Sequence, residues 1–358
     1  MQGRIVWLRM NRLDERRAFI CGLSGEVLTD DERQFLQTQR PWGVILFARN
    51  IGNKSQLIEL ISEIRNIADD VSFPILIDQE GGRVARLQPP LVRLHPAAAL
   101  YGQLYDKNLE DGLWATEMGG RIMADDLMHL GINIDCAPCL DVSRPETSDI
   151  IGNRAFSDHA DRVAELGAAF ARGLLAGGVL PVVKHIPGHG RGAIDSHIGL
   201  PQVDASFDDM QASDFVPFQR LRHNLIAMTG HLLFTALDPY RVSTCSPHIV
   251  EQIIRQEIGF SGLLMGDDVS MQALSGSIGA RGAASIAAGC DLILHCNGDL
   301  AEMLEVAGEA PRLKGRSLER AAAVQNALKM GEQRRKKGPV VSAGDINRWG
   351  EMLSSVSP

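Results

Sequence analysis

The stretch GVILFARNIGNKSQLIELISEIRNIADDVSFPILIDQE, residues 43–80, joins two short apolar runs through a segment with helical periodicity. The runs 43–47 and 74–78 are almost continuously apolar, which is typical of strands buried on both faces of a parallel sheet. Between them, residues 55–70 repeat apolar side chains at helical spacing, and Ser55 offers an N-cap side chain. The stretch therefore predicts a strand, a crossover helix and a second, parallel strand.

The same unit recurs along the chain. Six further apolar runs have the character of these two, at residues 19–23, 132–136, 181–185, 226–230, 263–267 and 292–296. Residues 161–178 form another helical pattern, which closes on glycines. Eight strands with helical crossovers predict an α/β protein whose fold is a (β/α)8 TIM-type barrel in a single domain. An open doubly wound sheet is the alternative, but no G-x-G-x-x-G turn follows the first run.

The composition of the 358 residues narrows the class of protein. Apolar residues make up 45% and charged residues 22%, which is ordinary for a globular chain with a large core. A net charge of −8 argues against nucleic acid as a partner, because phosphate binding needs a positive surface. Six cysteines in a chain of this length do not suggest a disulfide framework, and we expect Cys136 and Cys139 to be packing residues.

The sequences near the two ends of the chain predict its cellular location and its domain organisation. The apolar run 5–8 is too short for the core of a signal peptide, and no stretch reaches the roughly 20 apolar residues of a membrane span. We therefore expect a cytoplasmic monomer without a membrane partner. Because the pattern changes after residue 310, we expect a barrel over 1–310 and a C-terminal helical extension over 311–358, packed on or following the barrel.

Ionisable side chains gather where the predicted strands end. They follow six of the eight runs, as Asp78 and Glu80, Asp141 and Arg144, Lys184 and His185, His231, Asp267 and Asp268, and His295. The carboxyl ends of all strands in a barrel face one mouth, where active sites are built. The pattern therefore favours an enzyme over strands that merely emerge into solvent, although His231 fits the mouth and the core equally well.

The segment VVKHIPGHGRGAIDSHIGLP, residues 182–201, holds a dense group of titratable side chains. One interpretation is a zinc site made by His185, His189, Asp195 and His197. Pro187 excludes a helical ligand pair, however, and Lys184 would repel the cation. The other interpretation is an acid–base pair, because Asp195 and His197 lie two positions apart and can point to one side of an extended segment.

Two stretches carry these carboxylates and histidines, KHIPGHGRGAIDSHIGLP (184–201) and GFSGLLMGDDVSM (259–271). They resemble the two catalytic signatures of glycoside hydrolase family 3, and most closely those of its bacterial cytoplasmic β-N-acetylglucosaminidases of peptidoglycan recycling. Other stretches resemble that branch in the same order, at residues 43–57, 76–87, 131–142 and 150–159. The resemblance implies a (β/α)8 barrel, in agreement with the strand pattern.

The resemblance also implies roles for individual residues. Asp267 matches the nucleophile, His197 the acid/base on a mobile loop, and Asp195 its dyad partner. The residues that match those holding the N-acetylglucosamine ring are Asp78, Arg86, Arg154, Lys184 and His185. The implied enzyme is a retaining exo-β-N-acetylglucosaminidase without metal or cofactor. Its implied small-molecule substrate is N-acetylglucosamine linked to 1,6-anhydro-N-acetylmuramic acid, with or without a stem peptide.

Some positions depart from the family pattern. Gly266 stands where a serine is usual, Arg191 and Gly192 replace a pair of the Asp-Thr type, and Ile186 replaces an aromatic residue. None of these positions carries a proposed catalytic group. We expect His189, in the sequence PGHG, to brace the loop rather than to contact the sugar.

Two other functions stay open at the level of sequence. A glycoside phosphorylase is one, because a neutral imidazole base does not repel phosphate as a carboxylate would. A catalytically silent sugar-binding barrel is the other, and the presence of Asp195, His197 and Asp267 speaks against it.

Overall fold

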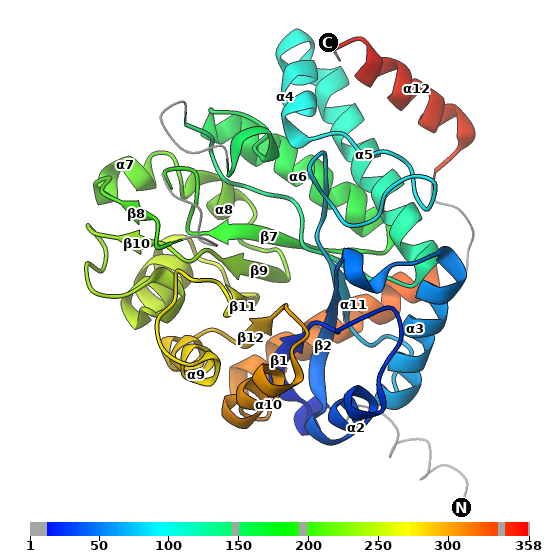
Figure 1. Cartoon of the computed structure of the whole chain (residues 1–358). Helices are drawn as coiled ribbons and strands as arrows, with labels where there is room; N and C mark the ends of the chain where they lie inside the picture. The colour runs from blue at the N-terminus through cyan, green and yellow to red at the C-terminus, as the bar shows by residue number, and fades with distance from the viewer. Residues whose placement is uncertain (1–12, 145–149, 193–198, 336–340, 357–358) are drawn as a thin grey trace, which may run out of the picture.

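Eight parallel strands form a closed barrel in this computed structural model, which describes residues 13–144, 150–192, 199–335 and 341–356 (Figure 1). In the order in which they pair, the strands are β1 (Arg17–Cys21), β12 (Leu292–His295), β11 (Leu263–Asp268), β9 (Ile226–Thr229), β7 (Leu180–Ile186), β6 (Ile134–Asp135), β3 (Ile75–Ile77) and β2 (Pro41–Leu46). Each of the eight apolar runs overlaps one of these strands. The predicted α/β fold, a (β/α)8 TIM-type barrel, is confirmed.

Side chains along each strand alternate between the interior of the barrel and the layer of helices. In β2, Ile45 belongs to the interior cluster, whereas Val44 and Leu46 pack under the helices. In β7, Val182 faces the interior and Val183 faces the helices. Both faces of the sheet are therefore apolar, which explains why the sequence runs show no polar alternation.

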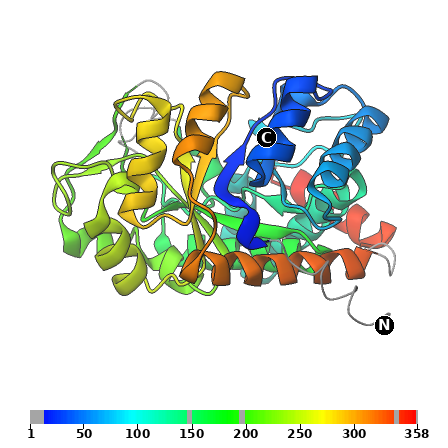
Figure 2. The same ribbon diagram turned by 90° about the horizontal axis from the view of Figure 1, so that it is seen from below.

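Helices cover the outside of the barrel (Figures 1 and 2). The helices that precede residue 310 are α2 (Asp30–Gln39), α3 (Lys54–Ala68), α4 (Ala98–Lys107), α5 (Leu109–Leu130), α6 (Ala160–Gly177), α7 (Phe207–Gln211), α8 (Val216–Arg220), α9 (Ile278–Ala288) and α10 (Leu300–Glu309), with a π-helix, η6 (Ile249–Glu257). Within the described ranges, no helix is long and apolar enough to cross a bilayer.

The two helices predicted from sequence are α3 and α6, but the expected N-cap of α3 was wrong. Asn53, not Ser55, caps this helix, and its side chain accepts a hydrogen bond from the backbone N of Gln56 at 3.1 Å. The helix begins at Lys54, so Ser55 already lies in its first turn. An asparagine at the N-cap satisfies an amide that the helix itself leaves without a partner.

The chain after residue 310 forms two helices. Figure 2 shows α11 (Gly315–Arg335) crossing the amino-terminal end of the barrel, where Ala321, Val324 and Leu328 join the interior cluster of the strands. The last helix, α12 (Ala343–Ser354), lies against α4 and α5. The domain boundary at residue 310 stays a prediction, while the described helices beyond it pack on the barrel.

A buried carboxylate ties α11 to the strands at this end. Asp291, just before β12, accepts hydrogen bonds from the backbone N of Leu264, from Arg255 and from Arg320 of α11, each at 2.9 Å. A buried carboxylate with two guanidinium partners is costly to disrupt, because removal of one partner leaves uncompensated charge. Asp291 therefore stabilises the end of the barrel that faces away from the mouth.

Candidate active site

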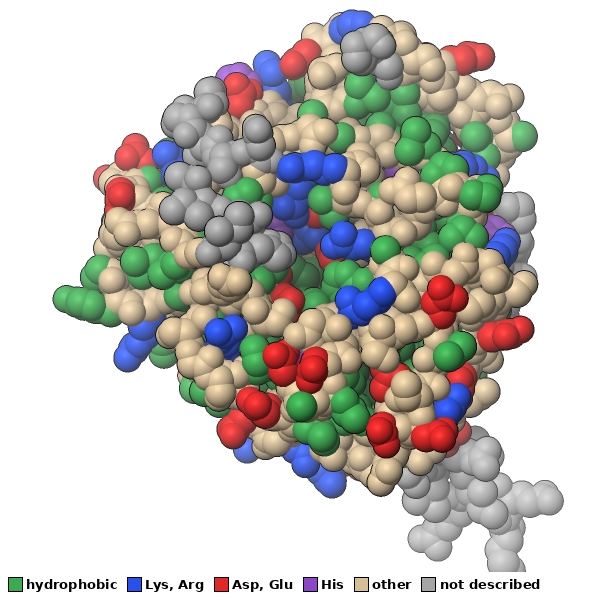
Figure 3. All heavy atoms as spheres, viewed as in Figure 1, with side chains coloured by type: hydrophobic (Ala, Val, Ile, Leu, Met, Phe, Trp, Pro, Cys, Tyr) green, Lys and Arg blue, Asp and Glu red, His purple; other side chains and the backbone are tan. Residues whose placement is uncertain are grey.

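A cavity of about 300 Å³ lies at the carboxyl ends of the barrel strands. Figure 3 shows this face, where Lys and Arg side chains surround a central hollow. Six of the eight predicted site residues line the cavity, namely Asp78, Arg86, Arg154, Lys184, His185 and Asp267. The other two, Asp195 and His197, fall in residues 193–198, which lie outside the described residues.

A larger cavity, of about 720 Å³, lies at the opposite end of the barrel between α2, α3 and α11. It contains none of the predicted site residues. Because barrel enzymes build their sites at the carboxyl ends of the strands, the smaller cavity is the candidate active site.

A network of charged side chains forms one wall of the candidate site. Lys184 of β7 is almost fully buried, and its Nζ lies 2.8 Å from Asp78 Oδ1 and 2.7 Å from Glu80 Oε1. Arg154 makes a two-pronged contact with Glu80, with distances of 2.8 Å from Nε and 2.7 Å from Nη2. Arg86 Nη2 lies 3.2 Å from Asp78 Oδ2. Two carboxylates thus meet three cations, and each charge has an opposite partner.

The cations decide the protonation of both carboxyl groups. Burial alone would raise the pKa of Glu80, but Arg154 and Lys184 outweigh burial and hold this pKa well below its ordinary value. Burial would likewise raise the pKa of Asp78, and Lys184 and Arg86 lower it instead. Both groups are therefore carboxylates at neutral pH, and they can accept hydrogen bonds from a ligand.

The sequence prediction left Glu80 out of the site, although it noted this residue at the end of a strand. In the structure Glu80 joins Arg154 to Lys184 and so sets the position of two predicted site residues. The sequence did contain a signal, because Asp78 and Glu80 lie two positions apart and extended backbone directs such side chains to one side.

Asp267 and Asp268 end β11 and have different surroundings. Among the described residues, the Asp267 carboxylate accepts one hydrogen bond, from the backbone N of Asp268 at 2.8 Å. The Asp268 carboxylate accepts from the backbone N of Ser270, from the Ser270 hydroxyl and from the backbone N of Cys296. Asp268 thus holds the chain beyond the strand, whereas Asp267, which lines the cavity, has acceptor positions left open by the described residues.

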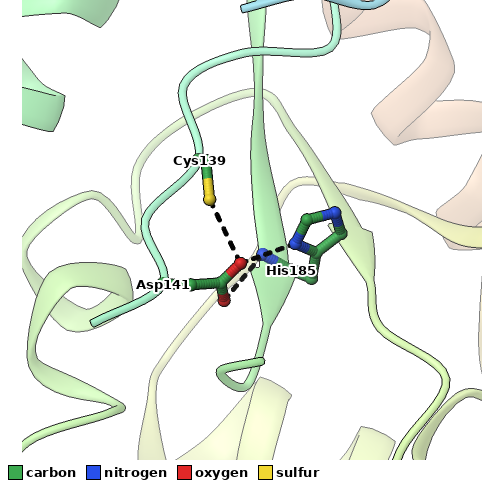
Figure 4. Close-up of side chains that lie close together, drawn as sticks. All are labelled: Cys139, Asp141 and His185. Carbon is green, nitrogen blue, oxygen red and sulfur yellow. Dashed lines mark hydrogen bonds and ion pairs between the residues drawn. The ribbon is translucent and has the colours of Figure 1, made fainter. Parts of the chain in front are cut away.

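Another buried carboxylate, that of Asp141, lies beside His185 (Figure 4). Asp141 Oδ2 lies 2.6 Å from His185 Nδ1 and accepts from Cys139 Sγ at 3.2 Å. Asp141 Oδ1 accepts from the backbone N of His189 at 2.6 Å and from the backbone N of His185 at 3.3 Å. Burial would raise the pKa of Asp141, but His185 and His189 outweigh it, so this pKa lies well below its ordinary value.

Cys139, Asp141 and His185 also have the composition of a metal site. Their ligand atoms lie within 4.8 Å of one another. Burial, however, raises the pKa of the Cys139 thiol well above its ordinary value, and Arg154 Nη2 lies 3.5 Å from His185 Nε2. A thiol that resists ionisation and a nearby guanidinium both disfavour a cation, so the geometry fits a hydrogen-bonded network better. The alternative zinc set considered from the sequence cannot be examined in the described residues, because it includes Asp195 and His197.

The other histidines near the mouth are buried. The ring of His189 packs edge-on against His185 with centroids 5.5 Å apart, and burial lowers the pKa of His189 to about 4. His231 is fully buried, and its Nε2 donates to the backbone O of Asp268 at 3.0 Å. The structure therefore gives His231 a place in the core.

The departures from the family pattern fit their surroundings. Arg191 Nε donates to the buried carboxylate of Asp214 at 2.8 Å. At Gly266, an added Cβ would lie 3.1 Å from Thr244 Cγ2, so a larger residue would require Thr244 to shift. Arg191 thus has a buried counter-charge, and Thr244 limits the space at Gly266.

Comparison with known proteins gives the family. Residues 11–330 match the glycosyl hydrolase family 3 N terminal domain. The chain belongs to glycoside hydrolase family 3. Its relatives include the beta-hexosaminidase of Methylococcus capsulatus, which is 39% identical over 279 residues that cover 77% of this chain and 81% of that protein. The beta-hexosaminidase of Pseudomonas aeruginosa is 36% identical over 283 residues, or 78% of this chain and 82% of the relative.

The solved structures agree with the sequence relatives. Native NagZ from Neisseria gonorrhoeae superposes with a TM-score of 0.82 at 30% identity, covering 96% of this chain and 98% of the other. The same protein has been solved in complex with N-trifluoroacetyl-D-glucosamine. This family 3 protein is a glycoside hydrolase that acts as a β-N-acetylhexosaminidase, as the resemblance implied.

Glu80→Gln is expected to weaken substrate binding by the hexosaminidase. The amide keeps the shape of the carboxylate but loses the charge that holds Arg154 and Lys184. We expect kcat/KM for an aryl N-acetylglucosaminide to fall about 10- to 100-fold, the size of a lost charged hydrogen bond. Glu302→Gln is the matched control, since Glu302 pairs with His295 and does not line the cavity. Equal kcat/KM values for the two variants would contradict the role of Glu80.

The buried His189 predicts a pH-dependent stability. Because its pKa is about 4 when folded and 6.5 ordinarily, the unfolded chain binds a proton between these values that the folded chain does not. Stability is therefore lost as pH falls from about 6.5 toward 4. We expect His189→Gln to reduce the change in unfolding free energy between pH 7 and pH 5 by about 2 kcal/mol. Denaturant unfolding at pH 7 and pH 5 measures this difference in the free energy of unfolding. A variant with the same pH dependence as the wild type would refute the lowered pKa of His189.

Proposed function

We propose that this hexosaminidase is a retaining exo-β-N-acetylglucosaminidase in which Asp267 is the nucleophile and His197, with Asp195, is the acid/base. The observation that carries the proposal is that Asp267 shares one cavity with all five predicted ring-binding residues. Asp267 also has open acceptor positions among the described residues, whereas Asp268 is occupied by Ser270 and Cys296.

The proposed reaction proceeds in two steps. Asp267 attacks the anomeric carbon and forms a glycosyl ester, while His197 gives its proton to the leaving oxygen. His197 then takes a proton from water as the water hydrolyses the ester and restores the Asp267 carboxylate. No cofactor takes part in either step.

The charged network supports binding of the sugar ring. Asp78 can accept hydrogen bonds from ring hydroxyls, and Lys184, Arg86 and Arg154 can donate to hydroxyls and to the acetamide carbonyl. Because each charge of the network already has an oppositely charged partner, these groups can bind a polar, uncharged ring without leaving a buried charge unpaired. A sugar without the acetamide would leave donors unsatisfied.

We further propose 1,6-anhydro-N-acetylmuramic acid, with or without a stem peptide, as the leaving group. Muramic acid carries a carboxylate, and cationic side chains lie around the cavity. Arg83 is exposed and donates to the backbone O of Ile151 beside the cavity, and Arg86 is partly exposed. Such a rim favours an anionic leaving group. A cytoplasmic location stays part of this proposal, to be checked by cell fractionation.

The nucleophile can be identified by covalent trapping. A fluorinated N-acetylglucosamine donor is expected to leave an adduct on the peptide that contains Asp267, detected as a mass shift. A thiazoline that mimics the oxazoline of substrate-assisted cleavage should inhibit only weakly. An adduct on Asp268, or tight inhibition by the thiazoline without any adduct, would overturn the mechanism and leave the hexosaminidase activity standing.

His197→Ala is expected to affect substrates according to their leaving groups. Cleavage of N-acetylglucosaminyl-1,6-anhydro-N-acetylmuramic acid should slow about 10²- to 10⁴-fold, because its alcohol leaving group needs a proton. A nitrophenyl glycoside needs little protonation, so it should show a burst of nitrophenol followed by slow hydrolysis. His129→Ala, a change at an exposed histidine of α5, is the control. If His197→Ala slowed cleavage of both substrates equally and gave no burst, the role of His197 would be structural.

A further inference from the structure

We propose that Asp141 is a positioning residue that keeps His185 in the tautomer with its proton on Nδ1, so that Nε2 faces the sugar as a hydrogen-bond acceptor. Asp141 follows β6 and is fully buried, and His185 lies on β7 at the edge of the cavity. The inference rests on the proposed role of His185 in binding the ring, and it adds the residue that decides how His185 binds.

The Asp141 carboxylate uses its full capacity to accept hydrogen bonds. It receives one from the backbone N of His189 and three from His185 Nδ1, the backbone N of His185 and Cys139 Sγ, the last three drawn in Figure 4. An ionised carboxylate has about four lone-pair positions and no proton to give. Each of these contacts therefore has Asp141 as the acceptor, and His185 Nδ1 must carry a proton.

The other side of the imidazole ring leads to the same tautomer. Arg154 Nη2 lies 3.5 Å from His185 Nε2, and a guanidinium can only donate. His185 Nε2 therefore presents a lone pair to that side. Two neighbours on opposite edges of the ring, one that only accepts and one that only donates, select a single tautomer. Because the Arg154 contact is long, a ring hydroxyl that enters the cavity can replace it and donate to the lone pair of Nε2.

Asp141 also connects His185 with the chain that follows β7. Its Oδ1 holds the backbone N of His189, whose ring packs against that of His185. Both histidines line the cavity. One carboxylate thus sets the tautomer of one ring and the backbone position of the next, so its effect on binding exceeds that of a simple core hydrogen bond.

The substitution Asp141→Asn changes the expected tautomer of His185 while it keeps the shape of the side chain at position 141. In Asp141→Asn, the amide oxygen can still accept from the two backbone N–H groups, and the NH2 group takes the place of Oδ2. This NH2 donates to His185 Nδ1 and forces the proton to Nε2. His185 then offers a donor to the sugar and places an N–H against Arg154. We expect kcat/KM to fall about 10- to 100-fold, chiefly through KM.

The first test reads the tautomer directly. In the full-length protein labelled with ¹⁵N-histidine, long-range ¹H–¹⁵N spectra distinguish protonated from unprotonated ring nitrogens. The signals of His185 are those that disappear in the His185→Gln variant. In the wild type we expect His185 to carry its proton on Nδ1 and none on Nε2. In Asp141→Asn we expect the proton on Nε2 and none on Nδ1. A wild-type His185 protonated only on Nε2 would overturn the proposal, and this measurement stands even where the variant fails to fold.

The second test asks whether Asp141 acts through His185. In a double-mutant cycle, Asp141→Asn should cost about 10- to 100-fold alone and less than about twofold when His185→Gln is already present. Equal costs in both backgrounds would show a merely structural role. Asp291→Asn is the matched control, because it changes a buried carboxylate at the far end of the barrel and should lower stability without raising KM. The signals of His185 do not depend on the roles of Asp267 or His197, so failure here is distinguishable from failure of the proposed mechanism.

Discussion

A lysine buried inside a barrel must find its counter-charges on other strands, and this requirement organises the mouth of the enzyme. Lys184 of β7 meets Asp78 and Glu80, which follow β3, and Glu80 in turn meets Arg154 from the chain after β6. An unpaired buried ammonium would cost several kcal/mol. The three segments therefore cannot move apart without a large loss of stability, and the cavity between them keeps its shape.

The same pairing explains what kind of ligand the cavity suits. Each carboxylate and each cation of the network already has an opposite partner, so the remaining lone pairs and N–H groups suit hydroxyl and amide partners. Asp267 differs from this network, because its carboxylate has one hydrogen bond among the described residues. A neutral sugar can thus be held by a wall of paired charges and presented to a carboxylate that keeps acceptor positions open among the described residues.

Buried carboxylates serve two purposes at the two ends of the barrel. Asp291 binds two arginines and a strand amide at the amino-terminal end, where it fastens α11. Asp141 at the mouth accepts bonds from two histidines that line the cavity. Both groups satisfy the same rule, that a buried charge must be fully hydrogen-bonded. Only at the mouth do the partners of the carboxylate also line the candidate active site, as expected of a barrel enzyme.

The sequence alone was sufficient to predict the barrel and six of the side chains that line the cavity at its mouth, but it left Glu80 out of the site. Eight apolar runs predicted the strands, and parallel closure brings their carboxyl ends together whatever the packing details, so Asp78, Lys184 and Asp267 had to converge. The partners within the site were decided by the tertiary structure. Glu80 reaches Arg154 across 74 positions, and Asp141 reaches His185 across 44. Such pairings depend on the stagger and side-chain direction of neighbouring strands, which local periodicity does not encode.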